Sequence, residues 1–85
     1  MNIAIVDDLR SDADQLRTIL MSYAYENSLD LSIEVFSGGE EFLYEYKKYN
    51  YTLIFMDIYM NGISGIETAQ KIRETDTDTA IIFLS

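Results

Sequence analysis

Several residue types are missing from this chain of 85 residues, and each absence excludes a class of chemistry. There is no cysteine, which excludes disulfides and thiolate metal sites. There is no histidine either, which disfavours zinc and means that any bound metal must be held by oxygen atoms. No stretch approaches the roughly 20 apolar residues of a membrane span, and the first residues do not form a signal peptide. We therefore expect a soluble, cytoplasmic protein that does not contact a membrane.

Basic residues are also scarce. The chain has 6 lysines and arginines against 15 aspartates and glutamates, so its formal net charge is −9. Phosphate backbones would repel such a chain, and we do not expect these residues to contact nucleic acid. The charge suits a divalent cation or a basic protein surface. An acidic surface that only keeps the protein soluble would explain most of these acids, but not those that end apolar strands.

Short apolar runs alternate with helical patterns along the whole sequence. The apolar runs predict four strands, at residues 2–6, 31–36, 53–56 and 80–84. Helices are predicted to begin near Ser11 or Asp12, after Ser37, and near Ser64. The order β-α-β-α-β-α-β implies a parallel sheet with right-handed crossovers and with helices on both faces.

Each predicted helix carries apolar residues spaced by three and four, which predicts one buried face. These faces comprise Leu9, Ala13, Leu16, Leu20, Tyr23, Ala24 and Asn27 in the first helix, Phe42, Leu43, Tyr46 and Tyr49 in the second, and Ile66, Ala69 and Ile72 in the third. Ser37 and Glu40 fit a capping box that opens the second helix. Lys47 and Lys48 are expected near the end of that helix, where the helix dipole favours cations.

The last predicted strand, residues 80–84, is apolar and is followed only by Ser85. An uncovered apolar edge strand is unfavourable. We therefore expect residues 1–85 to form a single, incomplete domain that lacks one strand and one or two helices. We also expect dimerisation, strand exchange or aggregation through this strand.

Three carboxylates end two of the predicted strands. Asp7 and Asp8 follow the first strand, and Asp57 follows the third. If these strands are neighbours, they lie about 4.8 Å apart and share one rim of the sheet, where carboxylates about 5 Å apart repel by roughly 3 kcal/mol at an effective dielectric constant of 20. A cation would compensate this repulsion, and Mg²⁺ suits oxygen ligands. A carboxylate beside Mg²⁺ can attack phosphorus, and the Ser85 hydroxyl could donate to a phosphoryl oxygen on Asp57.

This pattern resembles the receiver domain of two-component response regulators. The shared features are an Asp-Asp pair after the first strand, an aspartate that ends the third, a glycine eight residues later, and a serine that ends the fourth. The resemblance covers the whole chain and implies a flavodoxin-like (CheY-like), doubly wound α/β fold. The strand order would be 2-1-3-4, with the fifth strand missing from this sequence.

The resemblance also implies the roles of the residues. Asp57 would accept a phosphoryl group from the phosphohistidine of a sensor histidine kinase. Asp8, Asp57 and the backbone carbonyl of Tyr59 would bind Mg²⁺, Asp7 would help through water, and Ser85 would be the switch hydroxyl. The domain would be a signalling module and not an enzyme, with only its own phosphorylation and dephosphorylation as chemistry. Residues 57–67 look most like receivers joined to a C-terminal, DNA-binding LytTR-type output domain, which implies transcription regulation.

Two departures from the family pattern matter. Most receivers have proline where this chain has Asn61, but asparagine tolerates the same turn. The family's lysine at the end of the fifth strand lies beyond Ser85, so these residues alone are expected to bind Mg²⁺ but to phosphorylate or switch poorly. The Tyr59 side chain is expected to hang over the acceptor and to tune the access of water.

The sequence is also compatible with other functions. A phosphatase or phosphotransferase of the haloacid-dehalogenase type also uses a strand-terminal aspartate with Mg²⁺, but it needs a second aspartate where this chain has Tyr59. A nucleotide or flavin binder would need a Gly/Ser/Thr-rich loop where Asp7 and Asp8 stand. A degenerate receiver would bind partners without phosphorylation. The three aspartates could also be ordinary helix caps and turn residues.

Overall fold

Four parallel strands form the centre of the structure, a computed structural model that describes residues 1–85. The strands are β1 (Asn2–Val6), β2 (Ser32–Phe36), β3 (Leu53–Asp57) and β4 (Ala80–Leu84). They lie in the order β2-β1-β3-β4, with every neighbouring pair parallel. This confirms the predicted strand order and the α/β class. The β3 strand also includes Asp57, one residue beyond its predicted end.

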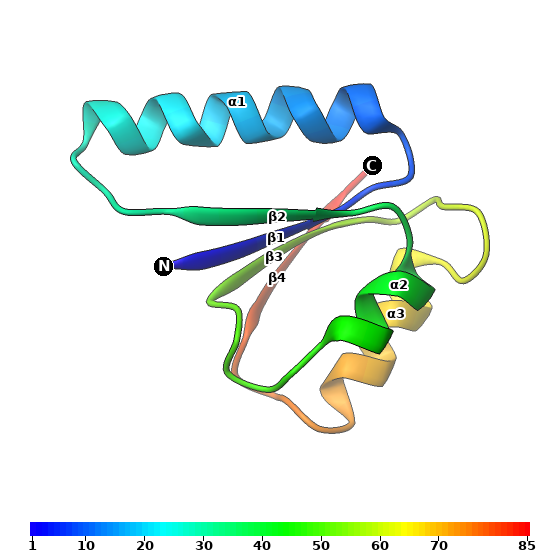
Figure 1. Cartoon of the computed structure of the whole chain (residues 1–85). Coiled ribbons are helices and arrows are strands. Elements are labelled where there is room, and N and C mark those ends of the chain that lie inside the picture. Colours follow the sequence, from blue (N-terminus) through cyan, green and yellow to red (C-terminus); the bar gives the residue numbers. More distant parts are fainter.

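Three helices cover the two faces of this sheet (Figure 1). Helix α1 (Arg10–Glu26) lies alone on one face, and α2 (Gly39–Glu45) and α3 (Gly65–Arg73) lie together on the other. In β1, every residue from Ile3 to Val6 is buried. A strand covered on both faces needs apolar residues at successive positions, which explains its unbroken apolar run. None of the helices combines the length and the apolar character needed to cross a membrane.

The main core lies between the sheet and the α2–α3 face. It consists of Ala4, Val6, Phe36, Phe42, Tyr51, Ile54, Met56 and Ile72. The rings of Phe36 and Phe42 meet edge to face, with their centroids 4.9 Å apart. This geometry stabilises aromatic pairs beyond the area that they bury. The core therefore fixes α2 against the carboxyl ends of β1 and β2.

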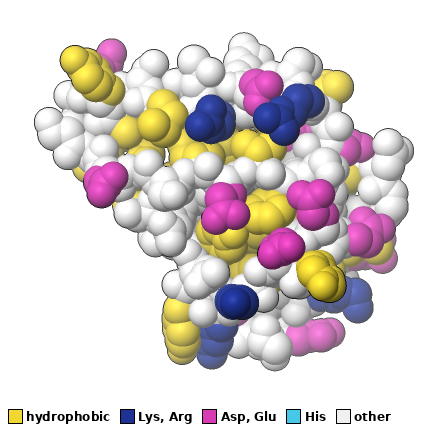
Figure 2. Space-filling model, viewed as in Figure 1, with side chains coloured by type: hydrophobic (Ala, Val, Ile, Leu, Met, Phe, Trp, Pro, Cys, Tyr) yellow, Lys and Arg dark blue, Asp and Glu magenta, His cyan; other side chains and the backbone are white.

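Helix α1 buries a narrower face than its sequence pattern predicts. The residues of α1 that are buried or partly buried on this face are Ala13, Leu16, Leu20 and Ala24. The prediction was wrong for Leu9 and Tyr23, which are 54% and 57% exposed, and for Asn27, which is also exposed. No second helix lies beside α1 on its face of the sheet, so the flanks of α1 have nothing to pack against (Figure 1). Figure 2 shows hydrophobic atoms visible beneath α1, and acidic side chains spread over this side of the molecule.

The other two helices also differ in detail from the prediction. Helix α2 ends at Glu45 because Tyr46 adopts an extended backbone conformation. Tyr49 therefore lies beyond the helix and is 76% exposed, not buried as predicted, and the two lysines before it are not in the last turn. In α3, Ala69 and Ile72 are buried, but Ile66 is 41% exposed. Ile66 lines an open groove between α3 and β4 and has no further layer over it.

The predicted capping box of α2 is wrong in both residues, because Ser37 is not the N-cap and Glu40 does not contact it. Gly38 is the N-cap, and no side chain caps the helix. The side chain that reaches back to Ser37 belongs to Glu41, which accepts from the Ser37 backbone amide at 3.4 Å and from its hydroxyl at 3.1 Å. Glu40 points elsewhere, into the loop after β3. A complete capping box stands instead at α3, where Ser64 and Glu67 satisfy each other's backbone amides.

Candidate functional site

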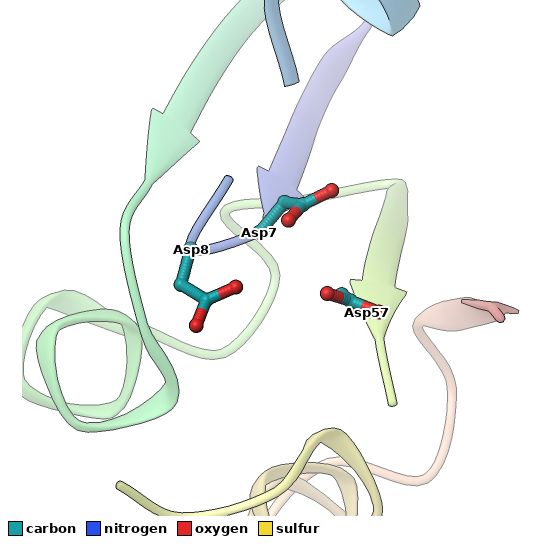
Figure 3. A group of neighbouring side chains, drawn as sticks. All are labelled: Asp7, Asp8 and Asp57. Carbon is teal, nitrogen blue, oxygen red and sulfur yellow. The ribbon is translucent and has the colours of Figure 1, made fainter. Parts of the chain in front are cut away.

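The carboxyl ends of β1 and β3 bring the three predicted aspartates together. The two strands are paired, with Val6 opposite Met56, so Asp7 and Asp57 come next on the same rim. One carboxylate oxygen from each of Asp7, Asp8 and Asp57 lies within 4.8 Å of the other two. Figure 3 shows the carboxylate of Asp57 pointing from β3 toward those that follow β1. The prediction that these three aspartates lie close together at one rim of the sheet is therefore confirmed.

Asp7 is the most buried member of the group, at 7% exposed. Burial raises its pKa, the backbone amide of Leu9 partly opposes this rise by donating to Asp7 at 2.9 Å, and the charge of Asp57 adds to it. The chain has one ion pair, Arg10 with Asp14 at 3.2 Å, so no basic side chain pairs with the cluster. Close carboxylates without a basic partner, all offering oxygen, fit a hard divalent cation such as Mg²⁺.

Asp8 is held by the loop that follows Asp57. One of its oxygens accepts from the backbone amide of Asn61 at 2.9 Å. This bond fixes one carboxylate oxygen and leaves the other without a hydrogen-bond partner. In the same loop, the carbonyl of Tyr59 accepts no hydrogen bond, and its side chain is 79% exposed. Both free oxygens are of the type that a magnesium ion needs.

Two glycines shape this loop. Gly62 has a φ of +78°, in the region that side-chain-bearing residues rarely adopt. Gly65 starts α3 directly against the end of β3, where a Cβ atom would clash with the carbonyl of Asp57. The amide of Gly65 donates to the carbonyl of Ile58 at 2.9 Å. The chain therefore turns back at once after Asp57 and places the start of α3 beside it.

Ser85 follows β4 at the same rim. Leu84 is the register partner of Asp57, and its carbonyl accepts from the amide of Ile58 at 3.0 Å. Asp7, Asp8, Asp57 and Ser85 thus lie at one rim of the sheet, as the sequence predicted. Sequence reasoning missed Glu40, whose carboxylate accepts from the amide of Ile63 at 3.1 Å, because it assigned that side chain to a helix cap. No local pattern in the sequence signals this contact across 23 residues.

Comparisons with known proteins identify the family. The model of the response regulator receiver domain matches residues 3–85. The sensory transduction protein LytT of Oceanobacillus iheyensis is 39% identical over 85 residues, which cover 98% of this chain and 33% of that protein. The transcriptional regulatory protein YvrH of Bacillus subtilis is 34% identical over 84 residues, which cover 99% of this chain and 33% of that protein. The chain thus spans about a third of the length of these relatives.

Solved structures agree with these matches. The response regulator TrrA of Thermotoga maritima, in complex with Mg²⁺ and BeF, is 34% identical, with a TM-score of 0.71 over 96% of this chain and 66% of that one. The complex of the histidine kinase ThkA with TrrA matches with a TM-score of 0.68 and 34% identity, over 99% of this chain and 67% of that one.

The fold and the site define a doubly wound α/β domain with an oxygen-ligand cluster at the carboxyl rim of its sheet. Together with the family match, they assign the chain: it belongs to the response regulator receiver domain family, which is a family of signalling domains of two-component systems.

Proposed function

We propose that Asp57 accepts a phosphoryl group from the phosphohistidine of a sensor histidine kinase. One carboxylate oxygen of Asp57 attacks phosphorus, the phosphorus–nitrogen bond breaks, and the histidine of the kinase leaves and takes up a proton. The observation that carries this proposal is the meeting of Asp7, Asp8 and Asp57 within 4.8 Å without a basic partner. The related protein TrrA is known both in complex with Mg²⁺ and BeF and in complex with the histidine kinase ThkA.

The metal in this proposal is Mg²⁺, held by Asp8, Asp57 and the carbonyl of Tyr59, with Asp7 acting through water. When bound, it would neutralise the charge that develops on the transferred phosphoryl group. The Leu9 amide orients Asp7, and the Asn61 amide orients Asp8. Ser85 is the switch hydroxyl, which would donate to a phosphoryl oxygen on Asp57.

The signal would pass to an output domain, which we propose to be a DNA-binding transcriptional regulator in the cytoplasm. The relatives LytT and YvrH are named as a sensory transduction protein and a transcriptional regulatory protein, and each is about three times as long as this chain. We also propose self-association through β4, which ends the sheet and exposes 45% of Ile82 and 42% of Phe83. Sedimentation across a range of concentrations tests this; a monomer throughout would refute it.

The phosphoacceptor role is tested by mass spectrometry after incubation with acetyl phosphate and Mg²⁺. The protein should gain one phosphoryl group, located at Asp57, and the Asp57→Asn variant should gain none. Asp30→Asn, an exposed substitution at the opposite rim, is the matched control and should behave as the parent protein. A receiver that only binds partners would gain no phosphoryl group in any variant, and phosphorylation at another residue would refute the assignment to Asp57.

A further inference from the structure

Glu40 lies in the first turn of α2, but its carboxylate accepts a hydrogen bond from a different segment of the chain. One of its oxygens accepts from the backbone amide of Ile63 at 3.1 Å, in the loop that joins Asp57 to α3. Gly62 lies directly against the same carboxylate, so close that a Cβ atom there would overlap it. The loop is therefore folded around the side chain of Glu40.

A second carboxylate holds this loop from the other side. Asp8, from the segment after β1, accepts from the amide of Asn61 at 2.9 Å. The amides of Asn61 and Ile63, two residues apart, thus donate to carboxylates from different parts of the chain. The carboxylate that binds the Asn61 amide, that of Asp8, belongs to the aspartate cluster. Because Gly62 sits between these two amides and has a wide conformational range, the loop needs such anchors to keep a single shape.

We propose that Glu40 is a positioning residue for the metal at this site. By holding the amide of Ile63, it fixes the loop, and with it the Asn61 amide that orients Asp8. The same loop carries the Tyr59 carbonyl, which accepts no backbone hydrogen bond and would bind the metal. Asp8 is then presented to the cation with one oxygen already bound and the other free. This inference rests on the proposed function, because it concerns the affinity of the same site for Mg²⁺. Partners of metal ligands commonly change metal affinity by 10-fold to 100-fold.

Variants at two neighbouring glutamates separate this role from charge and from helix stability. Glu40→Ala removes the acceptor, and Glu40→Gln keeps an acceptor oxygen without the charge. Glu41→Ala removes the same charge one position further along α2, where the carboxylate accepts hydrogen bonds from Ser37. Isothermal titration with Mg²⁺ alone gives the dissociation constant, and hydrogen exchange of the Ile63 amide reports the loop without any metal.

We expect Glu40→Ala to weaken Mg²⁺ binding about 10-fold and to speed exchange at Ile63. Glu40→Gln should restore most of both properties, and Glu41→Ala should change Mg²⁺ binding less than Glu40→Ala does. Equal losses in all three variants would show that only charge matters and would overturn the inference. So would Glu40→Ala with unchanged affinity in a protein whose parent binds Mg²⁺. If titration shows no Mg²⁺ binding to the parent protein and the same result for Asp8→Asn, the proposed function is refuted, and this inference, which rests on it, is refuted as well.

Discussion

The hydroxyl of Tyr46 donates a hydrogen bond to the carboxylate of Asp76, which ties the end of α2 to the loop before β4. Asp76 is 1% exposed and also accepts from the backbone amides of Asp78 at 2.9 Å and Thr79 at 3.2 Å. Arg73 donates to the carbonyl of Thr79 at 2.8 Å. This rim of the sheet is opposite to the aspartate cluster. Here the buried acid is fully hydrogen-bonded, which is typical of a structural role.

We predict that Tyr46→Phe lowers the melting temperature by about 4–8 °C, because Asp76 then loses one donor while it stays buried. Tyr44→Phe is the matched control, since Tyr44 is 88% exposed and its hydroxyl has no partner. Thermal unfolding followed by circular dichroism measures both. Equal melting temperatures for Tyr46→Phe and the parent protein would show that the hydrogen bond contributes nothing.

The same pair gives a prediction about pH. The pKa of Asp76 is lowered, first by the Tyr46 hydroxyl and then by the amide of Asp78, and the pKa of Tyr46 is raised, first by burial and then by its bond to Asp76. The lowered pKa contributes stability above the ordinary value of 3.8, which is lost as pH falls through the folded value. The raised pKa contributes stability below 10.0, which is lost as pH rises above it. The difference in melting temperature between the parent and Tyr46→Phe should therefore be largest between these limits and shrink in acid.

Asp7→Asn should stabilise the protein in the absence of metal. The substitution removes a buried charge that Asp57 repels, and the new amide oxygen can still accept from Leu9. We expect the melting temperature in EDTA to rise by about 4 °C or more. In Mg²⁺ the parent protein should have the higher melting temperature, because the site of the variant has lost part of its negative charge and binds the cation less tightly. A fall in stability in EDTA would mean that Asp7 is already neutralised by something other than a cation.

Added Mg²⁺ should raise the melting temperature of the parent protein. At about one hundred times its dissociation constant, a ligand of the folded state adds about 2.7 kcal/mol to the free energy of unfolding. Asp8→Asn should remove most of this gain, while its amide oxygen can still accept from Asn61 and keep the loop in place. Asp30→Asn should keep the gain. A melting curve that does not respond to Mg²⁺ would count against a metal site at this rim.

The sequence predicted the strands well because β1 and β3 are apolar on both faces, whereas their order in the sheet followed only from the resemblance to receiver domains. It also placed Asp7, Asp8 and Asp57 correctly, since parallel neighbours share one rim. It failed where contacts depend on other elements. The exposure of Tyr23 depends on which elements pack beside α1, and the spacing of apolar residues within α1 carries no information about those neighbours. Glu40 and Glu41 are identical side chains next to each other, and their spacing in the sequence does not tell which one reaches Ser37 and which one reaches Ile63.

Gly62→Ala tests how the loop and Glu40 depend on each other. An alanine at a φ of +78° is strained by about 1–2 kcal/mol, which corresponds to a loss of about 4–16 °C in melting temperature. Its Cβ atom would also overlap the carboxylate of Glu40, which must then release Ile63. Gly38→Ala is the control, since its Cβ atom would lie 3.8 Å from Glu40 in ordinary contact.

Because Gly62→Ala and Glu40→Ala break the same hydrogen bond, their effects on Mg²⁺ affinity should not add. The double variant should bind Mg²⁺ about as tightly as Glu40→Ala alone, although its melting temperature stays low because the backbone strain remains. Titration of the four proteins of this cycle measures the coupling. Additive losses in affinity would mean that the glycine and the glutamate act on the metal site by separate routes, and that the loop is not built around Glu40.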